Sequence, residues 1–267
     1  MKIPSNKIRP AIPLSAELEE IESAIRHDPG AVNLRVYLFQ LLCILGHWQR
    51  ALAQLQVCAQ LDATTLPMVK MYRELLRCEL LRAEVFSGKR LPQVLGEPPD
   101  WLGWLIEAQQ RLASGDVASS TALRTAAWAS APETSGIIDG APFNWLGDAD
   151  SRLGPVLEAI INGQYYWIPF TQLRKITLDA PADLRDLVWL SITLTFINDG
   201  QTIALIPTRY VNTEFACDDD VKRARVTHWT QIDDATTTGT GQRMLITDHA
   251  EHALLDVRHI QFHSLSH

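Results

Sequence analysis

The spacing of apolar residues changes near residue 140, and this change constrains the fold more than any other feature of the chain. Up to about residue 130, apolar side chains recur every three or four positions, which is typical of amphipathic helices. After Pro142 they alternate with polar residues in short runs separated by turn-forming residues. The sequence therefore predicts an α+β protein of two domains, a helical one over residues 15–140 and an α+β one over residues 141–267.

The helical part reads as a series of helical hairpins. Amphipathic runs over 16–27, 32–45 and 48–61 are separated by Asp28-Pro29-Gly30 and by Gly46. The 34-residue tetratricopeptide pattern can start at Val32 and again at Trp101, which places Ala51, Cys58, Ala108 and Ala127 at positions where that pattern has small residues. Between them, a helix over 68–86 is followed by the helix-breaking segment SGKRLPQVLGEPPD. We expect a TPR-like superhelix of helical hairpins with one irregular repeat.

Stacked helical hairpins present a concave face that can bind an extended segment or a helix of a partner protein. The residues that we expect on such a face are Val36, Gln40, Trp101, Leu105 and Gln109. The alternative for each of them is packing inside the protein. The first residues of the chain, 1–14, are expected to form a flexible tail.

The second half shows the period of two that antiparallel strands require. Strands are expected over 154–161 and 164–168, joined by the hairpin turn Asn162-Gly163, and then over 173–178. Pro181 is expected to start a helix over 182–189, and strands over 191–197 and 202–206 form a second hairpin. Asp218–Asp220 is expected to cap a short helix, DATTTGTG (234–241) to form a mobile loop, and 242–247 and 253–261 to form the last strands. This domain is expected to be mostly antiparallel.

Composition and charge exclude several classes of protein. Apolar stretches such as Leu41–Leu45 are far shorter than the roughly 20 residues that cross a bilayer, so membrane insertion is not expected. The start of the chain has no apolar core of a secretory signal, and its four cysteines stand singly, so we expect a cytoplasmic protein with reduced thiols. Residues 146–267 carry 10 basic and 16 acidic residues, which disfavours nucleic acid as a partner and favours a basic or amphipathic surface.

Searches for catalytic and cofactor motifs give negative results. Ser87-Gly88-Lys89 lacks the first glycine of a phosphate-binding loop, and Gly239-Thr240-Gly241 does not continue into G-x-G-x-x-G. The acids and histidines of 248–252 are interpreted as an exposed polar turn, with adventitious metal binding as the alternative. We therefore expect no catalytic residue, no cofactor and no metal site.

The segment LGDADSRLGPVLEA (146–159) carries spaced acids that resemble a metal or acid/base site. A calcium loop that starts at Asp148 would place Arg152 among its ligands and Ala159 where the last glutamate belongs, so this interpretation fails. Because the segment joins the two halves, we interpret Asp148, Asp150 and Arg152 as a structural strap that fixes the junction. The alternative is an enzyme that uses Asp150, Arg152, Glu158 and Arg209 in an interdomain cleft.

Several separated motifs resemble the ImpE/TagJ family of type VI secretion accessory proteins. They are DADSRLGPVLEAIINGQYYWIPF, PADLRDLVWL and LIPTRY in the second half, and LGHWQRAL, EVFSG and LGEPPDW in the first. The resemblance covers roughly residues 15–262. The residues of interest in these motifs and at the junction are Trp48, Trp145, Asp148, Asp150, Arg152, Glu158, Trp167, Arg185, Asp186, Trp189, Arg209 and Tyr210.

This resemblance implies a cytoplasmic, non-enzymatic adaptor. Its implied partners are the TssB-like small subunit of the contractile sheath and, in addition, the sheath-recycling ATPase ClpV, so that it would influence sheath assembly or disassembly. None of the family-motif residues carries an implied catalytic role. The alternatives are a hydrolase-like enzyme with a carboxylate site at the junction and a purely structural assembly factor.

Overall fold

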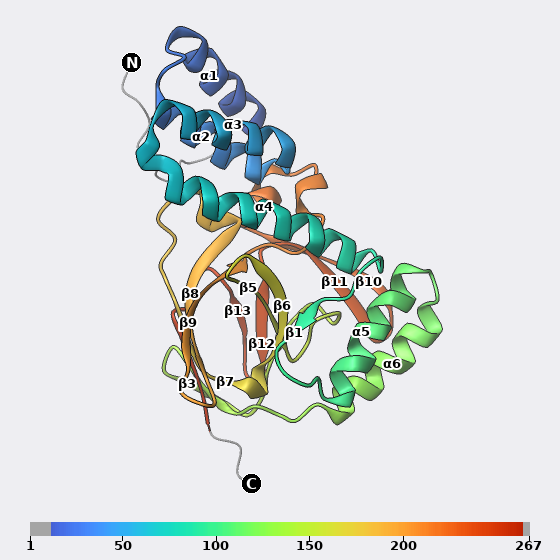
Figure 1. Ribbon diagram of the computed structural model, residues 1–267. Coiled ribbons are helices and arrows are strands. Elements are labelled where there is room, and N and C mark those ends of the chain that lie inside the picture. Colours follow the sequence, from blue (N-terminus) through green and yellow to red (C-terminus); the bar gives the residue numbers. More distant parts are fainter. Residues whose placement is uncertain (1–11, 264–267) are drawn as a thin grey trace.

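The structure is a computed structural model that describes residues 12–263, and helices fill most of its first half (Figure 1). Gly46 and Gly115 follow helix ends with φ of 71° and 85°, a conformation that favours glycine. Within the described residues the helices of the first half are α1 (Leu14–His27), α2 (Val32–Ile44), α3 (Trp48–Leu61), α4 (Leu66–Phe86), α5 (Asp100–Ala113) and α6 (Val117–Ser130). None of the described helices is both long enough and apolar enough to cross a membrane.

The helices pack as hairpins but do not form one continuous stack. Helices α2 and α3 are paired, and so are α5 and α6, while α4 runs across the sheets between these two groups (Figure 1). After α4 the chain does not add a second helix: Gln93–Val94 forms β1, which pairs in parallel with β6 (Gln164–Pro169). The helical hairpins of the sequence are thus confirmed, and a strand replaces the irregular half-repeat.

Most strands belong to one antiparallel sheet of nine strands, in the order β1-β6-β5-β9-β8-β7-β14-β2-β3. Among the strand pairs of residues 12–263, only that of β1 with β6 is parallel. A sheet of three strands has the order β13-β12-β4, and β10 and β11 form a separate hairpin. The remaining strands are β2 (Gly136–Ile138), β3 (Ala141–Phe143), β4 (Leu146–Asp148), β5 (Val156–Ile161), β7 (Leu173–Leu178), β8 (Trp189–Phe196), β9 (Gln201–Pro207), β10 (Thr227–Asp233), β11 (Thr236–Gly241), β12 (Met244–Thr247), β13 (Glu251–Ala253) and β14 (His259–Phe262).

Turn chemistry explains the hairpins that the sequence indicates. Asn162 and Gly163 join β5 to β6 with φ of 51° and 73°, the two positive values that such a turn needs. The loop between β8 and β9 is longer and has its positive φ at Asp199, with a value of 63°. Asp218 caps the short helix α7 (Asp219–Lys222) by accepting a bond from the Asp220 backbone N–H at 2.8 Å, as expected.

Two expected elements have a different secondary structure, a loop that is a strand and a helix that is a 3-10 turn. The segment 234–241, expected to be a mobile loop, supplies β11, because its main chain pairs with β10. The expected helix after Pro181 is only the 3-10 turn η3 (Leu184–Leu187), which ends where β8 begins at Trp189. The expected domain boundary after residue 140 lies inside the β2–β3 hairpin, so the sheet begins before it. The expected tail, 1–14, lies almost wholly outside the described residues, and α1 starts at Leu14.

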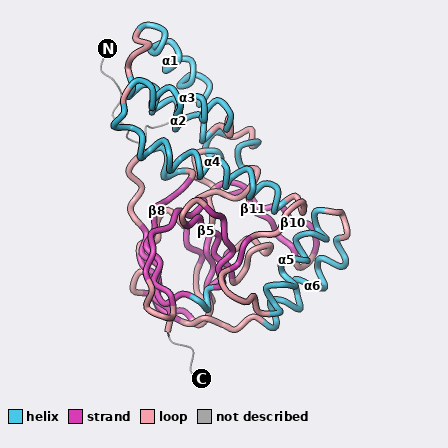
Figure 2. Tube along the Cα trace, viewed as in Figure 1, coloured by secondary structure: helices cyan, strands magenta, loops and turns pink. Residues whose placement is uncertain are grey.

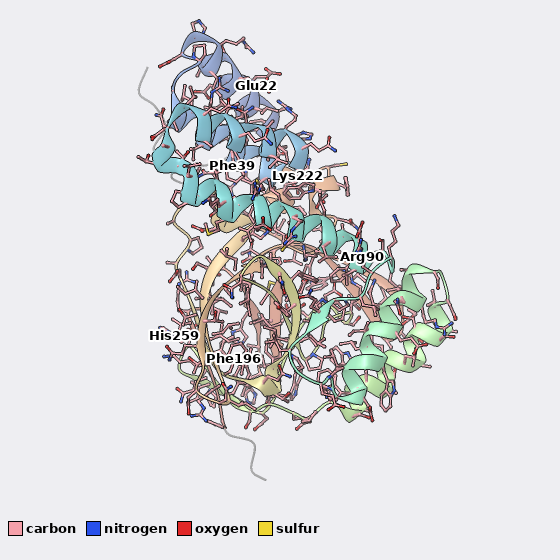
Figure 3. All side chains as sticks on the ribbon, in the orientation of Figure 1. Glu22, Phe39, Arg90, Phe196, Lys222 and His259 are labelled. Carbon is pink, nitrogen blue, oxygen red and sulfur yellow. The ribbon has the colours of Figure 1, made fainter. Side chains whose placement is uncertain are left out.

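One hydrophobic core connects the helices to the sheet. Figure 2 shows α4 lying over the strands, and Figure 3 places Phe39 of α2 beside α4, where its ring lies 5.3 Å from that of Tyr72. Tyr72 in turn contacts Trp189 of β8, with ring centroids 6.1 Å apart. Trp189 and Trp167 are fully buried. The two halves therefore share a core, and their mutual position is set by packing as well as by charge.

Candidate functional site: buried charges between the helices and the sheets

A buried ion pair joins α4 to β5. The other residues of β5 around Glu158 are apolar, and its carboxylate is completely buried. Arg82 of α4 donates from Nε to Glu158 Oε1 at 2.7 Å and from Nη2 to Oε2 at 3.1 Å. Tyr165 donates its hydroxyl hydrogen to the same carboxylate, and Trp167 donates to the Tyr165 hydroxyl at 2.7 Å. Glu158 thus accepts from both its own sheet and the helix above it.

Arg243 links Glu158 to Asp148 of β4. Its Nη2 and Nε donate to Asp148 Oδ2 at 2.6 and 3.0 Å, and its Nη1 lies 3.2 Å from Glu158 Oε2. Tyr210 donates to Asp148 Oδ1 at 2.9 Å. Asp148, Glu158 and Arg243 are all buried. Arg243, which directly precedes β12, therefore connects the carboxylates of Asp148 in β4 and Glu158 in β5.

Asp150 organises the turn between β4 and β5. Its carboxylate accepts from the backbone N–H and the guanidinium of Arg152, and Oδ2 also accepts from the backbone N–H of Gly239 at 2.9 Å. The Arg152 guanidinium stacks over the Phe86 ring at the end of α4, 4.9 Å from its centroid. The turn is therefore attached both to β11 and to the helical half, which is the geometry of a strap.

Arg209 attaches the sheet to the end of α2. Its guanidinium donates to two carbonyls at the helix end, that of Ile44 at 2.8 Å and that of Cys43 at 3.2 Å. The Cys43 carbonyl also accepts from the backbone N–H of Gly46 at 3.2 Å. The same guanidinium donates at 2.6 Å to the carbonyl of Lys222, the last residue of α7. A cation at this end also interacts favourably with the helix dipole.

Aromatic residues surround this junction. Trp189 donates from its indole N–H to Glu79 of α4 at 2.8 Å and lies 6.0 Å from Trp48, measured between ring centroids. The Arg185 guanidinium stacks over Tyr72, 5.2 Å from its centroid. Asp186 accepts from the backbone N–H groups of Ala182 and Asp183, which closes the η3 turn.

Burial and arginines act in opposite directions on the pKa values of these acids. Burial raises the pKa of Asp148 to about 6, because it outweighs the lowering by Arg243. Burial also acts to raise the pKa of Glu158, but Arg82 and Arg243 together bring it below its ordinary value. Burial raises the pKa of Glu79 against the effect of Arg82. These shifts belong to an enclosed network rather than to a solvent-exposed acid and base.

The residues expected on a concave binding face are mostly inside the protein. Val36 is half-buried, whereas the side chains of Gln40, Trp101, Leu105 and Gln109 are at most 5% exposed. Gln109 donates to the Phe86 carbonyl at 2.6 Å, which shows its structural use at the α4–α5 connection. These side chains are buried because they lie on the helix faces that pack against the rest of the protein.

Sequence reasoning found the acids of the junction together with Arg152 and Arg209, but it missed two arginines that face these acids, Arg82 and Arg243. It also missed Arg223, which follows α7 and donates to Glu17 of α1 at 2.6 Å. The signal that could have found Arg82 is its place on the buried stripe of α4, in step with Leu75, Cys78 and Val85. Within residues 12–263 no cluster of three or more His, Cys, Asp or Glu side chains could hold a metal ion.

Comparison with known proteins agrees with this architecture. The family model described as "ImpE protein" matches residues 140–261. A type VI secretion system accessory component, TagJ, from Pseudomonas aeruginosa is 45% identical over 249 residues, which cover 93% of this chain and 87% of that protein. A crystal structure of a Vibrio parahaemolyticus protein has the same fold, with a TM-score of 0.85 over 94% of each chain at 24% identity. This chain belongs to the ImpE/TagJ family of type VI secretion accessory components.

Proposed function

We propose that the protein is a non-enzymatic adaptor of the type VI secretion system that works in the cytoplasm. It would bind a component of the contractile sheath, a TssB-like small subunit, and so influence sheath assembly or its disassembly by ClpV. The similarity to TagJ over nearly the whole chain carries this proposal.

The geometry of the junction supports an adaptor more than an enzyme. Asp148, Asp150 and Glu158 are each completely buried. Each also contacts at least one arginine, at distances from 2.5 to 2.7 Å. A general acid or base must reach a substrate proton within hydrogen-bond distance, and these carboxylates are occupied by internal partners. Their arrangement instead holds helices and sheets in one fixed relation, which suits a scaffold that presents surfaces.

Binding to purified sheath proteins tests the proposal directly. The full chain would be titrated into the TssB–TssC complex and, separately, into ClpV, with binding followed by calorimetry. Saturable binding to the small subunit is expected. Folded protein that binds neither would refute the adaptor role. Crosslinking with mass spectrometry on the same complex would then identify the contacting face.

A further inference from the structure

A small cleft opens where α6 ends and β4 begins. It has a volume of about 230 Å³, and Trp128 and Trp145 are among the residues that line it. Trp128 is 39% exposed, although it is one of the largest apolar side chains of the protein. A cleft of this size is smaller than the 300 Å³ or more of a typical small-molecule site, so it suits a single inserted side chain.

A glycine lies close to each of the two indoles. Gly154 has φ of 52°, and a Cβ atom there would lie 2.5 Å from Cζ2 of Trp128. The indole of Trp128 therefore lies directly on the main chain of the strap. A Cβ atom at Gly147 would lie 3.9 Å from Cζ3 of Trp145, in ordinary contact. The walls of the cleft are thus set against the backbone at Gly147 and Gly154.

The chemistry of the lining selects a cation with an apolar stem. Glu133 is the charged residue among those that line the cleft, and the others are mainly apolar, including Pro132 and Pro155. Indole faces attract cations, and Trp is the strongest such acceptor among the aromatic side chains. Among residues 12–263 the cation–π contacts use the rings of Phe86 and Tyr72 and neither of these indoles.

We propose that this tryptophan cleft, formed by Trp128, Trp145 and Glu133, binds an arginine or lysine side chain that a partner protein presents. The aliphatic stem lies against the indoles that line the cleft, and the charged head reaches the Glu133 carboxylate. A buried stem with a charged end at the rim is the usual arrangement of such side chains on apolar surfaces. The assignment goes beyond the adaptor role, because it concerns the chemistry of one contact and needs no sheath protein for its test.

Indole N–H signals in NMR spectra test the site with short peptides. The probes are acetyl-Gly-Arg-Gly-amide and acetyl-Gly-Lys-Gly-amide, with the citrulline peptide as the neutral match for arginine and acetyl-Gly-Pro-Gly-amide as the probe for a proline groove. Trp128→Phe and Trp145→Phe assign the two signals. Trp104, which is 38% exposed on α5, is the matched control because it is equally accessible.

The two basic peptides are expected to shift the Trp128 and Trp145 signals saturably and to leave the Trp104 signal unchanged. Glu133→Gln is expected to weaken binding about threefold, the size of an exposed charge pair. The proposal is overturned by any of three results: no shift up to ~20 mM peptide, far above the range expected for a specific contact; equal shifts with the citrulline or proline peptide; or unchanged affinity in Glu133→Gln.

Discussion

Replacing Arg82 by methionine should destabilise the protein strongly. The substitution keeps an apolar stem of similar length on α4 but leaves the buried Glu158 without its closest cationic partner, at 2.7 Å. Breaking a buried pair by removing one member typically costs about 3 to 5 kcal/mol. Because Arg243 remains 3.2 Å from Glu158, we expect the lower end, about 3 kcal/mol.

The same helix provides a matched control. Arg77 also pairs with a glutamate, Glu74, at 2.8 Å, but its side chain is 67% exposed. An exposed pair contributes roughly 0 to 1 kcal/mol, so Arg77→Met should cost less than about 1 kcal/mol. Urea unfolding of both variants, followed by tryptophan fluorescence and by circular dichroism, measures the difference. With a slope of about 3 kcal/mol per molar urea, Arg82→Met should lower the midpoint by about 1 M.

Repeating Arg82→Met in a second variant, Glu158→Gln, identifies the cause of the lost stability. In a Glu158→Gln protein the buried acceptor carries no charge, so Arg82→Met should cost about 2 kcal/mol less there than in the wild type. Equal costs for Arg82→Met and Arg77→Met would refute the reasoning, because burial would then have no effect. An unchanged cost in the Glu158→Gln background would show that packing, not the ion pair, explains the loss.

Three further predictions concern the same junction. The folded-state pKa of Asp148, about 6, exceeds its ordinary value of 3.8. The contribution of Asp148 to the free energy of unfolding therefore falls as pH rises from about 4 to about 6, by on the order of 3 kcal/mol. Asp148→Asn should remove this pH dependence in unfolding free energies measured across that range. Arg209→Met removes the side-chain donor to the carbonyls of Ile44 and Lys222 and should cost about 2 kcal/mol by urea unfolding, whereas a cost near zero would contradict the helix-end contact. Gly154→Ala should destabilise more than Gly96→Ala, because both have positive φ but only the first would collide with Trp128; equal costs in thermal unfolding would show that the indole moves freely.

Local chemistry made part of the fold predictable from the sequence. The β5–β6 hairpin depends on two adjacent residues with positive φ, and the dipeptide Asn162-Gly163 predicts such a turn directly. The β10–β11 hairpin has no such signal, because most side chains of β10 are exposed and β11 consists of Thr and Gly. Its position is fixed by contacts from afar, such as Ser151, whose backbone N–H donates to the Thr237 carbonyl at 3.0 Å. The alternation of apolar and polar residues within one strand gives no information about such hydrogen bonds to distant segments of the chain.

The acids of 146–159 show why a charged motif alone does not define a site. Their spacing is compatible with chemistry, and what decides their role is the set of groups that the fold places opposite them. Arg82 lies 76 residues before Glu158 along the chain, and Arg243 lies 95 residues after Asp148. An arginine on a buried helical stripe needs acceptors, because an unpaired charge there would be too costly. Arg82 of α4 finds the carboxylate of Glu158, whereas Arg124 of α6 donates to the hydroxyls of Thr236 and Ser120. Such an arginine therefore predicts a buried polar contact, and an acid that it occupies is not free to act on a substrate proton.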